Sequence, residues 1–187
     1  MNLEYFDLLD VEGNPIGIIK ERSEVHRDGD WHKAIHIWII NQKGEILLQR
    51  RCETKDSDPN MLDISCAGHL SAGDCSLDGA LRELKEELDL EINPKELIFI
   101  KTLQRSWKDN HGFVDNEYDD LYILRTDKKI EEMVYQKEEI SEIFFVSYQK
   151  FKEMVASRQP DMVMYDEEFE ILFGMFDKEF DKKNTRN

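Results

Sequence analysis

Long hydrophobic runs are missing from this sequence of 187 residues. No apolar stretch approaches the roughly 18 residues that a membrane-spanning helix needs. Cysteine is also scarce, and three cysteines at irregular spacing argue against the disulfide framework of a small secreted domain. The N-terminus lacks the basic segment followed by an apolar segment that is typical of a secretory signal. We therefore expect a reduced, cytoplasmic protein.

Basic residues are few in comparison with acidic residues. The sequence contains 25 Lys and Arg residues against 41 Asp and Glu residues, which gives a net charge of −16 at pH 7. Such a surface repels nucleic acids and anionic membranes, so neither is expected as a partner. An anionic small molecule would need a bound metal ion or local cations to approach.

The length and the hydrophobic patterns predict a single α/β domain over residues 1–187. We expect residues 1–30 to form an N-terminal hairpin elaboration and residues 181–187 to form a disordered polar tail. The expected strands are 3–10, 16–21, 34–40, 45–51, 97–103, 121–125 and 143–146. The expected helices are 77–88, 151–156 and 167–180, with Ser76 as a plausible N-cap of the first.

Three glutamates share one turn of the expected helix at 77–88. Residues three and four apart are neighbours on a helix, so Glu83, Glu86 and Glu87 form one acidic patch. Like charges at this spacing destabilise a helix by roughly 0.2–0.5 kcal/mol per pair, and a bound cation offsets that repulsion. Mg²⁺ takes oxygen ligands and is typically shared with substrate phosphates. On the helix pattern alone, a solvated glutamate face is the favoured alternative.

The spacing around the patch resembles the signature of the Nudix hydrolase family. Gly68 is followed after five residues by Asp74, and after seven more by Arg82 and the glutamate patch. The sequence departs from the family at Asp74, which replaces Glu, and at Asp89, which replaces Gly. Asp is one of the few residues besides Gly that accept a left-handed conformation, so the second change is tolerable.

This resemblance implies a Nudix-type α/β/α sandwich with a mixed β-sheet, one catalytic helix and additional C-terminal helices. It also implies that Arg82 orients Glu83 and that the bound ion is Mg²⁺, with Mn²⁺ as an alternative. The implied metal-binding residues are Glu83, Glu86, Glu87 and Gly68.

A longer likeness points to one branch of the family. Residues 5–7, 24–32, 44–51 and 115–117 resemble type I isopentenyl-diphosphate isomerase and its hydrolase-like relatives. The isomerase holds a metal with histidines and glutamates. The positions that match this second metal site are His26, His32, His69, Asp115 and Glu117. The alternative for each histidine is an ordinary hydrogen-bonded core or surface residue.

The catalytic cysteine of the isomerase is absent. Its position, directly before the Gly-His pair, is Ala67. The adjacent Cys66 is expected to point to the opposite face, because side chains alternate along an extended segment. No tryptophan follows Trp107, whereas the isomerase carries a late one. Since the acid set is complete, the sequence favours hydrolysis, with an isomerase or a non-catalytic diphosphate sensor as alternatives.

The expected reaction is Mg²⁺-dependent attack of water on a diphosphate in a nucleoside-diphosphate-type small molecule. The expected catalytic residues are Glu83, Glu86, Arg82 and Glu117. The general base is open among Glu83, Glu86, Glu117, Glu138 and Glu139. Arg51 and Lys55 match positions that contact the anionic substrate in the isomerase relatives; the alternative is a solvent-facing strand end. Dimers are common in this family, so a homodimer is an open alternative.

Overall fold

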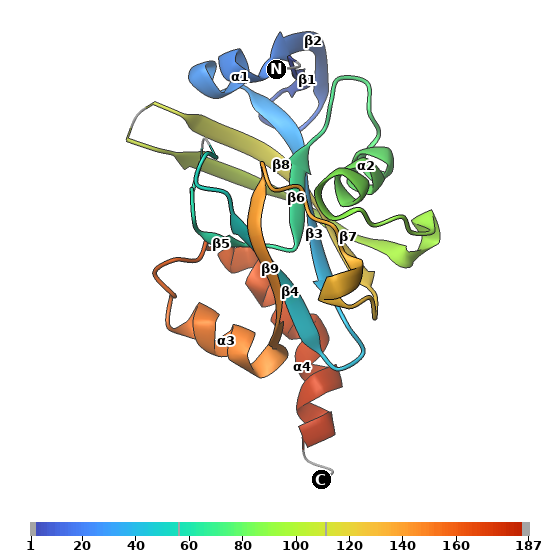
Figure 1. Cartoon of the computed structure of the whole chain (residues 1–187). Helices are drawn as coiled ribbons and strands as arrows, with labels where there is room; N and C mark the ends of the chain where they lie inside the picture. Colours follow the sequence, from blue (N-terminus) through green and yellow to red (C-terminus); the bar gives the residue numbers. More distant parts are fainter. Residues whose placement is uncertain (1–2, 56, 111, 185–187) are drawn as a thin grey trace. The chain divides into compact units, whose positions relative to one another are not determined.

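The computed structural model describes residues 3–55, 57–110 and 112–184 (Figure 1). They form nine strands and four α-helices, so the expected α/β fold with a mixed sheet and additional C-terminal helices is confirmed. The chain divides into two compact units. Unit 1 contains Met1–Ile37 and Cys66–Leu124, and unit 2 contains Trp38–Ser65 and Arg125–Asn187. The single domain expected from the length stays a prediction.

Unit 1 carries the glutamate patch and the five residues of the second candidate metal site. Its elements are β1 (Tyr5–Leu9), β2 (Pro15–Glu21), α1 (Arg22–Asp28), most of β3 (Trp31–Ile40), β6 (Cys66–His69), α2 (Ser76–Leu88), the 3-10 turn η1 (Pro94–Glu96), β7 (Leu97–Lys108) and β8 (Val114–Arg125). The expected N-terminal hairpin is β1 with β2, whereas α1 was not expected. The helix α1 ends at Gly29, whose φ of 73° lies in the left-handed region that glycine adopts at little cost.

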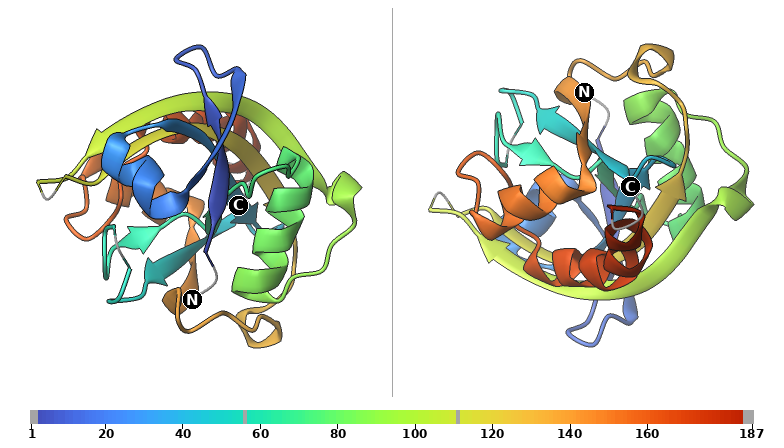
Figure 2. Two further views of the ribbon diagram at one scale, coloured as in Figure 1. Left: turned by 90° about the horizontal axis from the view of Figure 1, so that it is seen from above. Right: turned by 90° about the horizontal axis from the view of Figure 1, so that it is seen from below.

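The strand β3 organises the sheet of unit 1. Antiparallel pairing with β6 places Ala34 opposite His69 and His36 opposite Ala67. The strand β8 also pairs with β3, and β7 pairs with β8 to form a long, curved ribbon (Figure 2). Because side chains alternate along a strand, His32, His36, Ala67 and His69 share one face of the sheet.

The helix α2 matches the predicted helix with one correction at its start. The N-cap is Cys75 rather than Ser76, and the Ser76 hydroxyl instead lies 2.7 Å from the hydroxyl of Tyr122, within hydrogen-bonding distance. The helix ends at Asp89, which adopts a left-handed φ of 51° as expected. The buried apolar side chains of α2 are Ala80, Leu84 and Leu88.

Unit 2 is built on β4, which pairs antiparallel with β5 and β9. Its elements are the end of β3, β4 (Glu45–Arg51), β5 (Leu62–Asp63), the 3-10 turn η2 (Ile130–Glu132), β9 (Ile140–Ser147), α3 (Tyr148–Ala156) and α4 (Asp166–Asn184). In its core, Trp38 packs edge-on against Phe151 and Phe169, and the indole N–H donates to Glu168 at 2.7 Å.

The helix α4 runs four residues into the segment that was expected to be a polar tail, and residues 185–187 lie outside the described residues. None of the helices in the described ranges is long and apolar enough to span a membrane.

Candidate active site

The helix α2, which carries the glutamate patch, lies beside β6 (Figure 1). Gly68 is on the face of β6 that points to α2, and a Cβ atom at this position would lie 2.2 Å from Cδ of Glu83. Atoms cannot approach so closely, so only glycine leaves room for the carboxylate. Within the patch, Glu87 is buried, Glu83 is half-buried and Glu86 is exposed.

Arg82 contacts two of the three carboxylates, the last residue of β6 and the loop before α2. Its Nη1 donates to Glu83 Oε1 at 2.7 Å and to Glu86 Oε2 at 3.0 Å. Its Nη2 donates to the carbonyl oxygen of His69 at 3.0 Å, and its Nε lies 3.7 Å from Asp74 Oδ2. The contact expected between Arg82 and Glu83 is therefore present, and the guanidinium offsets part of the repulsion within the patch.

Burial dominates the electrostatics of the patch. Burial is the largest cause, Arg82 opposes it and Glu86 adds to it, and together these effects raise the pKa of Glu83 to about 7. Burial also raises the pKa of Cys66 well above its ordinary value, with Glu87 and Glu83 as the next causes. The Cys66 thiol is thus protonated and lies on the glutamate side of β6. Ala67 lies on the other face, opposite His36, so the expected alternation is observed.

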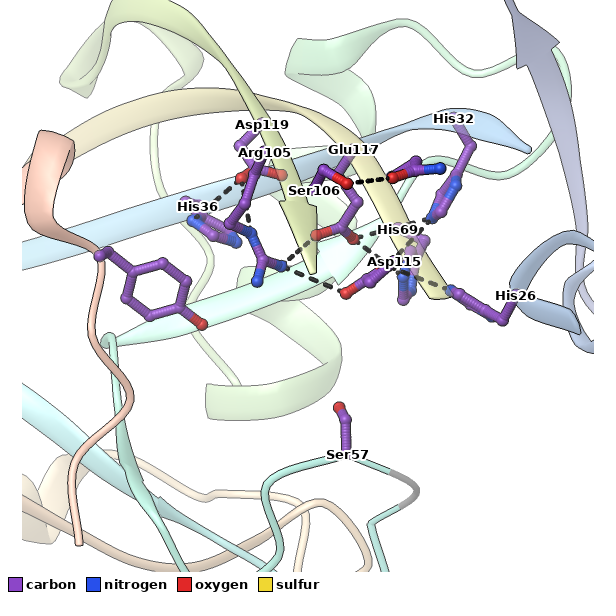
Figure 3. Close-up of polar contacts among 12 residues, drawn as sticks. His26, His32, His36, Ser57, His69, Arg105, Ser106, Asp115, Glu117 and Asp119 are labelled. Carbon is purple, nitrogen blue, oxygen red and sulfur yellow. Dashed lines mark hydrogen bonds and ion pairs between the residues drawn. The ribbon is translucent and has the colours of Figure 1, made fainter. Parts of the chain in front are cut away.

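The other face of this sheet carries a second group of titratable side chains (Figure 3). We call His26, His32, His69 and Asp115 the histidine cluster. One potential ligand atom from each of these residues lies within 4.8 Å of the others. The Nε2 atoms of His26 and His32 lie 3.4 and 3.8 Å from Asp115 Oδ1, and His69 Nε2 lies 3.2 Å from Glu117 Oε1. The structure therefore brings together all five residues that the sequence suggested.

The geometry of the histidine cluster fits a cation. Nδ1 of His32 lies 3.1 Å from the carbonyl oxygen of Asp30, which can only accept, so Nδ1 carries the hydrogen and the Nε2 lone pair faces the cluster. Burial lowers the pKa of His32 to about 4, which keeps the ring neutral. Within the described residues, Nε2 of His26 and of His32 and Oδ1 of Asp115 are buried without a hydrogen bond. Buried polar atoms are normally bonded, so these three atoms suit a metal ion.

Aromatic rings enclose the histidine cluster. Phe6 stacks on His32 and His69 with ring centroids 5.1 and 4.8 Å apart, and Phe113 stacks on His26 at 4.4 Å. These contacts hold the imidazoles in place, and His26 and His32 are buried from water.

Arg105 is a further member of this face that the sequence motifs do not reveal. Its guanidinium contacts Glu117, lies 3.3 Å from Asp115 Oδ2 and reaches Asp119 Oδ2 at 3.2 Å (Figure 3). Burial acts to raise the pKa of Glu117, but Arg105 and the nearby imidazole of His69 hold it well below its ordinary value. The spacing of Asp115, Glu117 and Asp119 could have revealed this acidic face, since residues two apart on a strand point the same way.

The two candidate substrate-binding residues lie in unit 2 and have partners there. Arg51 Nη1 donates to Asp63 Oδ2 at 2.7 Å, while Nε and Nη2 donate to the carbonyl oxygen of Ser57 at 3.1 and 2.9 Å. Lys55 forms an ion pair with Glu139. Substrate binding by Arg51 and Lys55 stays a prediction.

Comparisons with known proteins agree with this picture. A family model described as NUDIX domain matches residues 30–165. The chain is 43% identical to Nudix hydrolase 3 of Arabidopsis thaliana over 87% of its own length, but it spans only 22% of that protein. It is 36% identical to an uncharacterized Nudix hydrolase of Clostridium acetobutylicum, covering 75% of this chain and 68% of that one.

An isopentenyl-diphosphate Δ-isomerase of Escherichia coli is 32% identical, covering 67% of this chain and 69% of that one. Among solved structures, a protein from Deinococcus radiodurans aligns with a TM-score of 0.65 at 21% identity, over 87% of this chain and 94% of that chain. At that identity the likeness shows the fold alone.

Proposed function

Because this chain belongs to the Nudix hydrolase family, we propose that it is a Mg²⁺-dependent enzyme that cleaves the diphosphate linkage of a nucleoside-diphosphate-type small molecule. The observation that carries the proposal is the packing of Glu83 against Gly68, with Arg82 bonded to Glu83 and Glu86. Three carboxylates on one turn repel one another, and a divalent cation offsets that repulsion while it binds a diphosphate.

The side chains of α2 would have two roles, metal binding and the orientation of the metal-binding carboxylates. Glu83, Glu86 and Glu87 would hold Mg²⁺ or Mn²⁺, which when bound neutralises charge on the diphosphate oxygens and activates water. Arg82 keeps Glu83 and Glu86 in fixed orientations through its two bonds from Nη1. Positioning of this kind supplies much of the catalysis when a phosphorus is attacked by water.

Two of the candidate general bases differ sharply in their basicity. In the metal-free protein Glu83 has a pKa of about 7, and a bound Mg²⁺ would lower it because a nearby cation favours the ionised carboxylate. Glu117 has a pKa held well below its ordinary value, so its carboxylate is a weak base and a good metal ligand. We therefore assign Glu117 to the second metal centre, and the general base stays open among Glu83, Glu86, Glu138 and Glu139.

We further infer that the histidine cluster and Glu117 form this second metal centre. Imidazole nitrogens favour transition metals, whereas carboxylates also suit Mn²⁺ and Mg²⁺. Three imidazoles with two carboxylates therefore suit Mn²⁺ or another first-row metal better than Mg²⁺. The neutral state of His32 and the unbonded nitrogens of His26 and His32 support this assignment.

Isomerisation of isopentenyl diphosphate is the second candidate. The similarity to the Escherichia coli isomerase and the histidine cluster both favour it. Against it, Ala67 stands where the isomerase has its cysteine, and the protonated Cys66 lies on the other side of β6. We therefore place hydrolysis first.

The proposal can be tested by ³¹P NMR in water enriched in ¹⁸O. The purified protein is incubated with Mg²⁺ and, separately, with nucleoside diphosphates, dinucleotides, sugar nucleotides and isopentenyl diphosphate. Hydrolysis predicts new monophosphate resonances, shifted by the incorporated ¹⁸O. Conversion of isopentenyl diphosphate to its isomer without phosphate release would support the isomerase. Saturable binding without turnover of any compound would instead indicate a sensor. The cytoplasmic location and the homodimer stay predictions.

A further inference from the structure

Arg105 lies directly across the β7–β8 ribbon from Glu117 and touches three carboxylates of β8. Its Nη2 contacts Glu117 Oε2 and lies 3.3 Å from Asp115 Oδ2, and its Nε lies 3.2 Å from Asp119 Oδ2. One cation thus connects three acids that follow one another along a single face of the strand (Figure 3).

Two of these acids use both of their oxygens. Oδ1 of Asp115 and Oε1 of Glu117 face the imidazoles of the histidine cluster. Oδ2 of Asp115 and Oε2 of Glu117 face Arg105. Arg105 therefore restrains the orientation of each carboxylate so that one oxygen faces the imidazoles, in the way that groups behind a metal site orient its ligands.

A second set of potential ligands lies beside the histidine cluster. His36, Glu117 and Asp119 are all buried, and one ligand atom from each lies within 4.8 Å of the others. Arg105 contacts two of these three residues. Its guanidinium therefore offsets one of the two carboxylate charges that would otherwise attract a second divalent cation.

The charges on this face balance when one divalent ion is bound. Asp115, Glu117 and Asp119 carry three negative charges, and Arg105 carries one positive charge. One divalent ion brings the sum to zero, whereas two ions would leave an excess of two positive charges beside Arg105. An uncompensated buried charge is costly. The next acid along the strand, Asp120, has its own partner in Lys33 at 3.0 Å.

We propose that Arg105 is a positioning residue that limits this face to a single divalent ion. It supplies the third positive charge and pairs with Glu117 and Asp119, two of the three residues of the second set of potential ligands. The inference rests on the metal centre proposed above for the histidine cluster.

The experiment counts bound Mn²⁺ in protein whose glutamate patch is disabled by Glu83→Gln and Glu86→Gln. Three variants are compared in this background: Arg105→Gln, Arg105→Lys and, as a matched control, Lys33→Gln, which removes a cation paired with Asp120. Equilibrium dialysis gives the number of ions, and electron paramagnetic resonance reports whether two ions are close enough to couple magnetically.

We expect one ion in the background protein, in Arg105→Lys and in Lys33→Gln, and two coupled ions in Arg105→Gln. Adding Asp119→Asn to Arg105→Gln should return the count to one. Two ions in the presence of Arg105, or one ion in Arg105→Gln, would overturn the role of Arg105 but leave the metal centre standing. No ion in any protein would contradict the metal centre itself. If Arg105→Gln does not fold, the ion count of the background protein at saturating Mn²⁺ still tests the proposal. A second coupled ion in that protein would contradict the proposed limit of one ion.

Discussion

Gly68 and Glu83 touch between β6 and α2 so closely that a methyl group on Gly68 would lie 2.2 Å from Cδ of Glu83. The substitution Gly68→Ala should therefore displace the carboxylate. Because a misplacement of about 1 Å at a catalytic group can cost about 100-fold, we expect a loss of that order in kcat with weaker Mg²⁺ binding. Both are measured by phosphate release across a Mg²⁺ titration.

Gly174→Ala is the matched control for this substitution. A Cβ at Gly174 meets nothing within 4 Å, and the residue lies within α4. We expect unchanged activity and a gain in stability of up to about 1 kcal/mol from the better helix former. Unchanged Mg²⁺ affinity in Gly68→Ala would show that the position of Glu83 is unimportant.

Glu83 should make the metal-free protein less stable as the pH rises from about 4.5 to about 7. Its pKa of about 7 in the folded state exceeds the ordinary value of 4.5, so the folded protein holds a proton that the unfolded chain releases. The effect amounts to at most about 3 kcal/mol at pH 8. Glu83→Gln should remove it, which denaturant unfolding in the presence of a chelator can measure.

Because His32 also titrates, the pH dependence of the free energy of unfolding is compared between the wild type and Glu83→Gln. The pKa of His32 is lowered to about 4 in the folded protein. Between pH 4 and pH 6.5 the unfolded chain therefore binds a proton that the folded protein does not bind, and stability rises with pH in this range. This opposite trend cancels when the Glu83→Gln curve is subtracted from that of the wild type. Parallel curves between pH 5 and pH 8 would contradict the raised pKa of Glu83.

Arg51 should matter more for stability than Lys55. Arg51→Ala leaves the buried carboxylate of Asp63 without its cation, and removing one partner of a buried pair typically costs about 3–5 kcal/mol. Lys55→Ala removes a more exposed pair, which is worth at most about 1 kcal/mol. Urea unfolding of both variants measures the difference. Equal stability of Arg51→Ala and Lys55→Ala, with a raised KM for Arg51→Ala alone, would indicate that Arg51 binds the substrate instead of stabilising the fold.

The parts of the fold that follow a periodic pattern were predicted well. The helix α2 was correct to within one residue because its apolar stripe and acids repeat at helical spacing, and only the cap was shifted from Ser76 to Cys75. The strands β7 and β8 continue beyond the predicted limits because neither extension is apolar. The extension of β8 carries buried acids such as Glu117, and that of β7 carries exposed polar residues such as Gln104. The short helix α1 was missed because Val25 is its single aliphatic residue.

The role of Arg105 could not be predicted from the sequence, because the sequence does not show which residues face each other in paired strands. Alone it is one arginine near the end of an expected strand. Its importance depends on the register that places it opposite Glu117, and this register joins residues 12 positions apart. By contrast, the family motif fixes the spacing of Glu83, Glu86 and Glu87 within the chain itself, so the sequence could reveal it.

The most direct test of the proposed metal site compares phosphate release by Glu86→Gln and Glu91→Gln in saturating Mg²⁺. Glu86 belongs to the proposed metal site and bonds to Arg82, whereas Glu91 is an exposed acid just beyond α2 that pairs with Lys85. We expect Glu86→Gln to lose at least about 100-fold in kcat while remaining folded, because charge stabilisation at the reacting group is removed. We expect wild-type turnover for Glu91→Gln. Full activity of Glu86→Gln would contradict the assignment of the glutamate patch as the metal site that drives hydrolysis.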